Sequence, residues 1–406
     1  MNRFMLIGCL LILMNIAVTA VEGASMDRQY IRQIITADNN TSRTISWQSN
    51  KFTPYPVLEY KKVNSKKIFR ERGMVKSIAT PKGTVFIYTV NLARLRPGVS
   101  YEYRVGSVDE WSDWLILKMA QNDKCKALIF GDSQSSDHQV WKTTATKAFQ
   151  QNHDADFFIN MGDLVDNGES WYQWEQWLIG AKSLAEQIPA APLSGNHEDY
   201  SLAWQFTLPR TYLNLFELPD NGAAGLAGQS YSYDYGPVHF AVLDTQALEL
   251  NEYYPDLFER QALWLKQDLA ATKKTWKVVL MHRPAYGLLN GEEGNLIGAT
   301  FMPLFERFDV DVVLQGHLHC YSRSVPIRQG KASSTGPVYI CTGRSGDDVW
   351  LENHRQSLDD IFIDLPDKPN YLTLIADKNK LSIACFAQDG DLLDSFVLNK
   401  NKKRQP

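Results

Sequence analysis

Five apolar, strand-like runs of this chain are each followed by side chains that can bind a metal ion. The runs are KALIF, ADFFINM, IPAAPLS, WKVVLM and VDVVLQ, and their composition is typical of buried strands. The polar groups that follow them are Asp132, Asp163, Asn196, His282, and the pair His317 and His319. Open α/β sheets place ligands beyond the carboxyl ends of their strands, so we expect these groups to converge. Oxygen and imidazole ligands suit divalent metals such as Mn, Fe or Zn.

Each of these positions alone has an ordinary structural explanation. Gly-Asp and Gly-Asn pairs are common turn formers, and neutral imidazole often serves only in hydrogen bonds. In the stretch QGHLHCYSR, His317 and His319 are therefore either loop residues or two ligands of one polar cavity. Five polar strand ends in succession favour the second interpretation. Two metals roughly 3.5–4 Å apart need a bridging ligand, and a central Asp can bridge because each of its oxygens can serve a different ion.

Two regions with different patterns must position these residues. Residues 27–119 contain short alternating segments broken by Asn, Gly and Pro, which predicts an antiparallel β-sandwich. Its segment LARLRPGVSYEYRVGS is similar to the end of fibronectin type III domains. We expect this region to pack against the rest of the chain or to form a substrate rim. After the short linker QNDK, residues 124–398 alternate strand-like and helical stretches, as a layered α/β domain requires.

One helical stretch of the second region carries a wide aromatic stripe. In SWYQWEQWLIGAKSLAEQI, Ser170 is the expected N-cap. The stripe on one face consists of Trp171, Trp174, Leu178, Ala181 and Ala185. Such a stripe at helical spacing predicts core packing rather than a cofactor site. The stretch PDLFERQALWLKQDLAATKK predicts a second helix of the same kind.

Composition and the chain termini limit the binding partners and the cellular location that can be expected for this protein. The chain has 406 residues and a net charge of −4 without a long basic face, so nucleic acid is not an expected partner. Residues 1–25 combine Arg3, an apolar run and small residues, which predicts a signal peptide and a secreted or periplasmic protein. An uncleaved membrane anchor and lipidation at Cys9 are the alternatives. No later segment reaches about 18 uninterrupted apolar residues, so stable membrane insertion after cleavage is not expected. Residues 399–406 form a basic tail.

Four cysteines follow the expected signal peptide. They are Cys125, Cys320, Cys341 and Cys385. In an exported protein they allow three disulfide pairings, but three of them lie in or beside apolar runs. Buried free thiols therefore explain the pattern at least as well.

The polar strand ends resemble the calcineurin-like metallophosphoesterase family, and more closely the purple acid phosphatases. The pattern of those enzymes is Gly-Asp, Gly-Asp-x-x-Tyr, Gly-Asn-His-Glu, a later His, and Gly-His-x-His. The resemblance extends to YSYDYGPVHFAVLDT, VVLMHRPAY, GHLHCYSRS and VYICTG. It covers nearly the whole chain after the signal peptide, because those enzymes also carry a fibronectin-like amino-terminal domain. The resemblance implies a β-sandwich followed by a four-layer α/β/β/α metallophosphoesterase domain.

The resemblance also implies a metal-binding role for each motif residue. The first of two divalent ions would be bound by Asp132, Asp163 and His319, with Asp163 bridging. The second would be bound by Asn196, His282 and His317. The metals would be Fe, Mn or Zn.

The activity implied by the resemblance is that of an acid-phosphatase-like phosphoric ester hydrolase. Metal-activated hydroxide would attack a small-molecule phosphate monoester. His197 would assist the leaving group, and Glu198 would orient His197. For His197, a third metal ligand or a structural hydrogen bond is the alternative. A phosphodiesterase or nucleotide hydrolase on the same site is the nearest rival function, and a binding or adhesion protein that uses the β-sandwich is the more distant one.

Two positions depart from the purple acid phosphatase pattern. Asp166 stands where the metal-binding tyrosine belongs, so the violet charge-transfer band is expected to be absent and a pair of divalent ions is favoured. We expect Asp166 beside the metal site or in solvent. Gln134 stands where those enzymes usually have Gly and many relatives have a His ligand. Its carbonyl oxygen is a candidate ligand of the first metal, and ligation stays open. Candidate substrate residues are His138, Tyr286, Tyr321, Arg323 and Arg344.

Overall fold

The computed structural model describes residues 29–107, 110–287, 292–349, 353–364 and 368–400. The expected signal peptide, with the anchor and Cys9 lipidation alternatives, lies outside these residues, as do residues 401–406 of the basic tail. Among the described residues, no helix has the length and apolar character needed to cross a membrane. The four described cysteines are buried free thiols.

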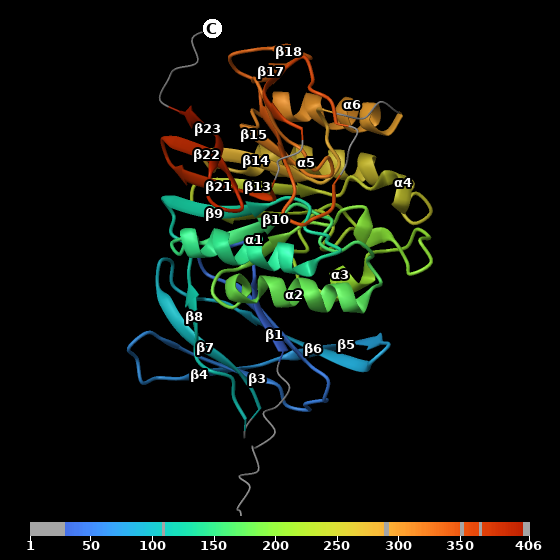
Figure 1. Ribbon diagram of the computed structural model, residues 1–406. Helices are drawn as coiled ribbons and strands as arrows, with labels where there is room; N and C mark the ends of the chain where they lie inside the picture. Colours follow the sequence, from blue (N-terminus) through green and yellow to red (C-terminus); the bar gives the residue numbers. More distant parts are fainter. Residues whose placement is uncertain (1–28, 108–109, 288–291, 350–352, 365–367, 401–406) are drawn as a thin grey trace, which may run out of the picture.

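A ten-stranded sheet runs through most of the molecule (Figure 1). In spatial order its strands are β23 (Leu392–Asn399), β22 (Lys380–Ala387), β21 (Asn370–Asp377), β9 (Lys124–Phe130), β10 (Phe157–Asn160), β11 (Ala190–Pro192), β1 (Gln29–Ile34), β2 (Arg43–Ser49), β6 (Gly83–Leu92) and β5 (Met74–Thr80). Strands β9, β10 and β11 are parallel neighbours. Their carboxyl ends therefore meet at one edge.

A seven-stranded sheet lies against the first. Its order is β12 (Tyr231–Tyr235), β13 (Val238–Leu243), β14 (Trp276–Met281), β15 (Val312–Gln315), β19 (Val338–Thr342), β16 (Tyr321–Ser324) and β20 (Asp359–Ile363). Strands β13, β14, β15 and β19 are parallel. A small hairpin of β17 (Ile327–Arg328) and β18 (Lys331–Ala332) extends from this region.

Helices cover the outer faces of the two stacked sheets (Figure 1). One side has α1 (His138–Gln151), α2 (Trp171–Ala185) and α3 (Arg210–Leu215), and the other has α4 (Ala247–Leu250), α5 (Leu257–Ala271) and α6 (Glu292–Arg307). Strand β14 shows the layering, because Val278 and Leu280 pack into the core shared with β9 and β10, whereas Val279 and Met281 pack under α5 and α6. The expected four-layer α/β/β/α domain is confirmed.

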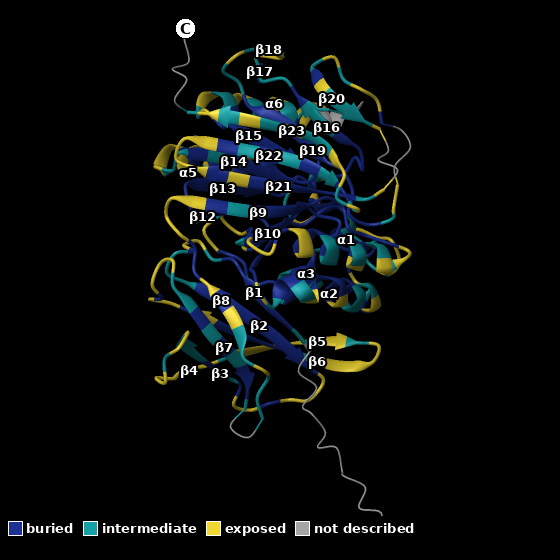
Figure 2. Ribbon diagram, turned by 60° about the vertical axis from the view of Figure 1, so that its left-hand side comes forward, coloured by how far each residue is buried: buried dark blue, intermediate teal, exposed yellow. Residues whose placement is uncertain are grey.

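The amino-terminal region is β-rich, as expected. A four-stranded sheet of β4 (Phe69–Arg72), β3 (Val57–Lys62), β7 (Ser100–Gly106) and β8 (Leu115–Lys118) faces β2 and β6 across a core of its own. Strands β4 and β5 were not expected from the sequence. Nearly all of their side chains are exposed, so neither strand shows the alternation that marks a half-buried strand (Figure 2).

The amino-terminal strands β1, β2, β6 and β5 belong to the same sheet as β9, β10 and β11, although the sequence suggested two regions separated by a linker. Strand β1 pairs in parallel with β11 through Ile34 and Ala190. The buried guanidinium of Arg32 donates to the carbonyl oxygen of Leu215 at 2.7 and 3.0 Å. The hydroxyl of Tyr103 donates to the carbonyl oxygen of Glu186 at 3.0 Å. Backbone pairing and side-chain hydrogen bonds therefore join the two regions.

The aromatic stripe predicted for residues 171–185 forms α2 and is buried. Ser170 occupies the N-cap position, but its side chain makes no capping hydrogen bond. Trp141 of α1 stacks on Trp177 at 5.7 Å between ring centroids, and its indole N–H donates to the Trp177 carbonyl oxygen. The stripe residues and Trp177 share one hydrophobic core with Trp141 of α1 and with β9 and β10, which is a core role.

Candidate metal centre

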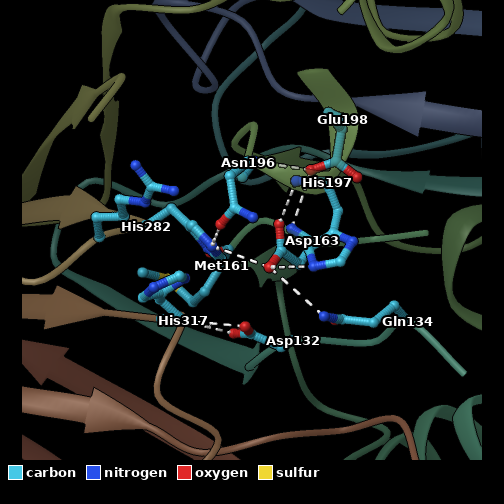
Figure 3. A network of polar contacts seen from close by, with 12 residues as sticks. Asp132, Gln134, Met161, Asp163, Asn196, His197, Glu198, His282 and His317 are labelled. Atoms are coloured by element: carbon cyan, nitrogen blue, oxygen red, sulfur yellow. Dashed lines mark hydrogen bonds and ion pairs between the residues drawn. The ribbon is translucent and has the colours of Figure 1, made fainter. Parts of the chain in front are cut away.

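The six ligands expected from the sequence converge at the carboxyl ends of strands from both sheets, and Figure 3 labels all of them except His319. Three of them, Asp132, Asp163 and Asn196, follow β9, β10 and β11, and the three histidines follow β14 and β15. All six are at most 6 % exposed. The parallel strands therefore deliver buried oxygen and imidazole groups to one cavity, as the position of ligands in open α/β sheets requires.

One group of ligands surrounds His282. Its Nε2 lies 3.1 Å from Asp163 Oδ2 and 3.1 Å from Asn196 Oδ1. One ligand atom from each of Asp163, His282 and His317 fits within 4.8 Å. His282 Nδ1 donates to the carbonyl oxygen of Met161 at 2.9 Å, so Nε2 is the nitrogen on which a metal would replace a proton.

A second group lies around Asp132 and His319. The Nε2 of His319 is 3.1 Å from Asp132 Oδ2. Gln134, which is 2 % exposed, approaches both His319 Nε2 and Asp163 Oδ2 at 3.5 Å through its amide nitrogen. Its carbonyl oxygen is buried without a hydrogen-bond partner. A rotation of this amide exchanges the two atoms, so Gln134 is positioned to offer an oxygen to the cavity.

Asp163 lies between the two groups, but its two carboxylate oxygens have different tasks. Oδ1 accepts a hydrogen bond from the backbone N–H of His197 at 2.9 Å. Oδ2 faces His282 on one side and Gln134 on the other. Oδ2 is therefore the Asp163 oxygen that faces the other candidate ligands, whereas Oδ1 is engaged by the backbone.

Several site residues have left-handed backbone conformations that are rare for residues other than glycine. The φ angles are +50° at Asp163, +74° at His317 and +51° at His319. Each such residue costs on the order of 1 kcal/mol or more, and surrounding contacts must hold it in place. Here the carboxylate of Asp132 accepts from the backbone N–H of His317 at 3.0 Å. Strained backbone concentrated in this way is typical of a functional site.

Glycines in the motifs allow the loops to approach each other closely. A Cβ at Gly162, where φ is +92°, would lie 2.5 Å from His282 Nδ1. A Cβ at Gly195 would lie 2.2 Å from Asp163 Oδ1. Any larger residue would push the ligands out of the cavity, so the Gly-Asp and Gly-Asn-His motifs need their glycines for space.

The electrostatics of the cavity favour a positive charge. Burial lowers the pKa of His282, but the Asp163 and Asp132 carboxylates outweigh that effect and raise the pKa to about 9. Burial and the neighbouring His282 and Arg283 hold the pKa of His317 well below its ordinary value. The buried carboxylates thus attract cations, while His317 stays neutral and can donate a lone pair.

These observations fit a pair of divalent cations. The oxygen and imidazole donors match the preference of Mn, Fe and Zn. The unpartnered Gln134 oxygen and the unpartnered Nδ1 of His319 are buried polar atoms, and such atoms are rare in folded proteins.

Glu198 has a task that differs from the one expected. Its carboxylate accepts from the backbone N–H of Asp163 at 2.9 Å, Leu164 at 2.9 Å, Val165 at 3.3 Å and Gly195 at 2.7 Å. Burial and the Asp163 carboxylate raise its pKa to about 8, and the hydrogen bonds from Gly195 and Val165 oppose this shift. Glu198 ties together the loops that carry Asp163 and Asn196, whereas the sequence suggested that it orients the His197 ring.

His197 stands at the solvent side of the centre. Its Nδ1 donates to the carbonyl oxygen of Asp166 at 2.7 Å, which leaves Nε2 at 4.0 Å from Asp163 Oδ2. Asp166 is 40 % exposed in its side chain, and its Oδ1 lies 3.6 Å from His197 Nδ1. Asp166 thus lies beside the candidate ligands and contacts His197.

Three of the other candidate substrate residues make ion pairs or hydrogen bonds with residues outside the candidate ligand set. Arg323 pairs with Asp394 and Asp360 at 2.7 and 2.6 Å, and the hydroxyl of Tyr321 also donates to Asp394. The hydroxyl of Tyr286 accepts from the backbone N–H of Leu358.

Two more of these candidates lie at loop and helix positions. Arg344 donates to the carbonyl oxygen of Gly346. His138 begins α1, where its ring contacts Tyr172.

Two contributions to the centre could not have been found from side-chain chemistry. The Met161 carbonyl oxygen accepts the hydrogen bond that fixes the His282 tautomer, and the backbone N–H groups of Asp163 and Gly195 donate to the Glu198 carboxylate. Because every residue has a backbone carbonyl and nearly every residue has a backbone N–H, the residue type does not reveal which of these groups take part. The Gly-Asn-His-Glu spacing was the only signal for Glu198.

Two protein families match this chain. Residues 125–321 match the calcineurin-like phosphoesterase family, and residues 29–118 match the purple acid phosphatase N-terminal domain. The first match contains every candidate ligand.

Curated relatives are named as phosphatases. Human acid phosphatase type 7 is 27% identical over 296 residues, which cover 64% of this chain and 64% of the relative. Purple acid phosphatase 21 of Arabidopsis thaliana is 30% identical over 268 residues, which cover 64% of this chain and 58% of the relative. The chain thus matches less than two thirds of the length of these relatives.

Solved structures share the fold. The purple acid phosphatase PPD1 from yellow lupin (Lupinus luteus) seeds superimposes with a TM-score of 0.78 at 20% identity and covers 92% of this chain and 74% of its own. The structure of PhoD has a TM-score of 0.65 at 15% identity and covers 92% of this chain and 91% of its own.

Proposed function

We propose that this chain, which matches the calcineurin-like phosphoesterase family over residues 125–321 and the purple acid phosphatase N-terminal domain over residues 29–118, is an exported hydrolase of small-molecule phosphate monoesters. The names of the relatives support acid-phosphatase-like activity. Export rests on the composition of residues 1–25.

The observation that carries this proposal is the convergence of oxygen and imidazole donors around Asp163 Oδ2. We assign one ion to the Asp132 and His319 side and a second to the His282, His317 and Asn196 side, with Asp163 between them. Gln134 completes the first side through its carbonyl oxygen. Divalent ions bound there supply Lewis-acid activation of water and neutralise charge on the phosphoryl group.

The residues of the chain have separate roles in this mechanism. The buried loops fix the geometry before substrate arrives, because Glu198 holds the Asp163 loop against the Gly195 loop. His197 presents Nε2 to the cavity, since its Nδ1 is held by the Asp166 carbonyl oxygen. In a monoester complex the imidazolium form of His197, protonated on both ring nitrogens, would donate its Nε2 proton to the leaving oxygen.

Substitution of His197 tests its role through the leaving group. His197→Ala should lower kcat on the order of 100-fold for glycerol 3-phosphate, whose alkoxide needs a proton. The loss should stay below about tenfold for 4-nitrophenyl phosphate, whose leaving group is stable as an anion. His153→Ala, at an exposed histidine outside the centre, is the control and should change neither rate. Equal losses on both esters would contradict proton donation.

Metal analysis and a comparison of esters test the function itself. Protein purified without chelators should contain two divalent ions per chain and no violet band, because position 166 lacks a tyrosine. Its kcat/KM should be higher for 4-nitrophenyl phosphate than for bis(4-nitrophenyl) phosphate. A strong preference for the diester would make it a phosphodiesterase. Absence of both metal and turnover across a metal panel would instead support a binding protein.

A further inference from the structure

An exposed aromatic loop stands directly beside His197. Residues 200–206 follow the short 3₁₀ helix η1 (His197–Asp199), and three apolar side chains of this loop face solvent. Leu202 is 63 % exposed, Trp204 is 54 % exposed and Phe206 is 45 % exposed. Single exposed apolar residues are ordinary, but three within five positions next to a reaction centre mark a binding surface.

The loop places its aromatic rings against the imidazole. The ring centroid of Trp204 lies 6.4 Å from that of His197 at an interplanar angle of 87°. Tyr200 contacts His197 at 5.6 Å and Trp204 at 5.6 Å, and Phe206 contacts Tyr200 at 5.7 Å. The rings thus form one connected wall that begins at the imidazole.

Hydrogen bonds fix the backbone turn that carries Trp204. The backbone of Trp204 has a φ of +57°, which is unfavourable for a tryptophan. Its N–H donates to the Ser201 carbonyl oxygen at 2.8 Å, and the Ser201 N–H donates to the Gln205 carbonyl oxygen at 2.9 Å. Asn167 Nδ2 donates to the same Ser201 oxygen at 2.7 Å. The strained turn is therefore anchored to the loop that follows Asp163, and it keeps the Trp204 ring exposed.

The wall also lies beside the exposed side chains of the centre. The six candidate ligands are buried, whereas His197 and Asp166 expose 21 % and 40 % of their side chains. A phosphoryl group bound at the ligands would direct its leaving group outward past His197. Tyr200 and Trp204 are the aromatic residues in contact with the His197 ring.

We propose that residues 200–206 bind the flat leaving group of the substrate, with Trp204 as the stacking residue. This assignment rests on the proposed phosphomonoesterase function and names its substrate class: phosphomonoesters that carry an aromatic ring, in particular nucleoside monophosphates. A base stacks on an aromatic side chain because both present extended π faces. The apolar wall has no fixed donor pattern that would select one base, so purine and pyrimidine esters are both accepted.

A pair of esters that differ only in the base tests this assignment. Adenosine 5′-monophosphate and ribose 5-phosphate share the same phosphate and the same primary alkoxide leaving group. The wild type should show a higher kcat/KM for the nucleotide, through a lower KM. Trp204→Ala should lower the ratio of the two kcat/KM values by about tenfold, as loss of one stacked base predicts. Trp204→Phe should keep the ratio within about threefold of the wild type because a ring is retained.

Tyr55→Ala provides the matched control. Tyr55 is 63 % exposed and lies in the amino-terminal β-rich region, and this variant should leave the ratio unchanged. An unchanged ratio in Trp204→Ala, or equal losses on both esters, would overturn the stacking role while the phosphomonoesterase function stands. Failure of the wild type to hydrolyse these two esters, with 4-nitrophenyl phosphate still turned over, would also overturn the assignment, whereas failure on all three would remove the proposed function as well.

Discussion

Asp163→Asn is expected to lower kcat/KM on the order of 10³-fold or more. Loss of a partner that merely supports a metal ligand costs roughly 10–100-fold, and Asp163 is itself the group between the two halves of the centre. Asparagine keeps the size of the side chain and an oxygen that can accept from the His197 N–H, but it removes the negative charge. The steady-state rate with 4-nitrophenyl phosphate and the metal content of the purified variant measure this effect.

The control for this substitution is Asp309→Asn. Asp309 also has a left-handed backbone, with a φ of +51°, and its side chain is 62% exposed. Asp309→Asn therefore reproduces the chemical change and the backbone type outside the centre, and both activity and metal content should stay at wild-type values. Full activity in Asp163→Asn, with metal retained, would exclude Asp163 as the group that links the two ions. The circular dichroism spectrum should show that both variants are folded.

Glu198→Ala is expected to reduce the free energy of unfolding by about 4 kcal/mol. Four backbone N–H groups lose a buried carboxylate acceptor, and a buried donor left without a partner costs roughly 1–3 kcal/mol. Water that enters the space left by the side chain will bind some of these N–H groups and so reduce the total loss of stability. Urea unfolding of metal-depleted protein measures the change without a contribution from lost metal.

Glu169→Ala is the matched control. Glu169 is exposed and accepts one backbone N–H, that of Leu202, at 3.1 Å. Its substitution should cost less than about 1 kcal/mol. The role suggested by the sequence predicts something different for Glu198→Ala: wild-type stability with an altered dependence on the leaving group, because His197 would lose its orientation. Unfolding and leaving-group data together separate the two roles.

The ligand loops could be predicted because their signal is local. Each buried parallel strand appears as an apolar run, and the residue types after it are those that the chemistry needs. The sequence could not show which oxygen of Asp163 faces the cavity. That depends on the His197 N–H, which the chain brings to Oδ1 from 34 positions away.

The features that the sequence missed share a physical cause. Glu198 binds backbone groups, which carry no residue identity. Strands β4 and β5 have two exposed faces, so their sequences lack alternation. The parallel pairing of β1 with β11 involves one residue pair, Ile34 and Ala190, and both residues belong to ordinary apolar runs. In each case the decisive interaction leaves no periodic or chemical mark in the chain.

The sheet that passes from β5 to β23 without a break has a consequence for how the protein can be divided. Removal of residues 27–119 would uncover the edge of β11, which then becomes a template for pairing with other chains. Strand β11 leads directly into Gly195 and Asn196. The amino-terminal region therefore covers the edge of the strand that positions Asn196 in the candidate metal centre. An isolated carboxyl-terminal half, with this edge exposed, would be prone to aggregate.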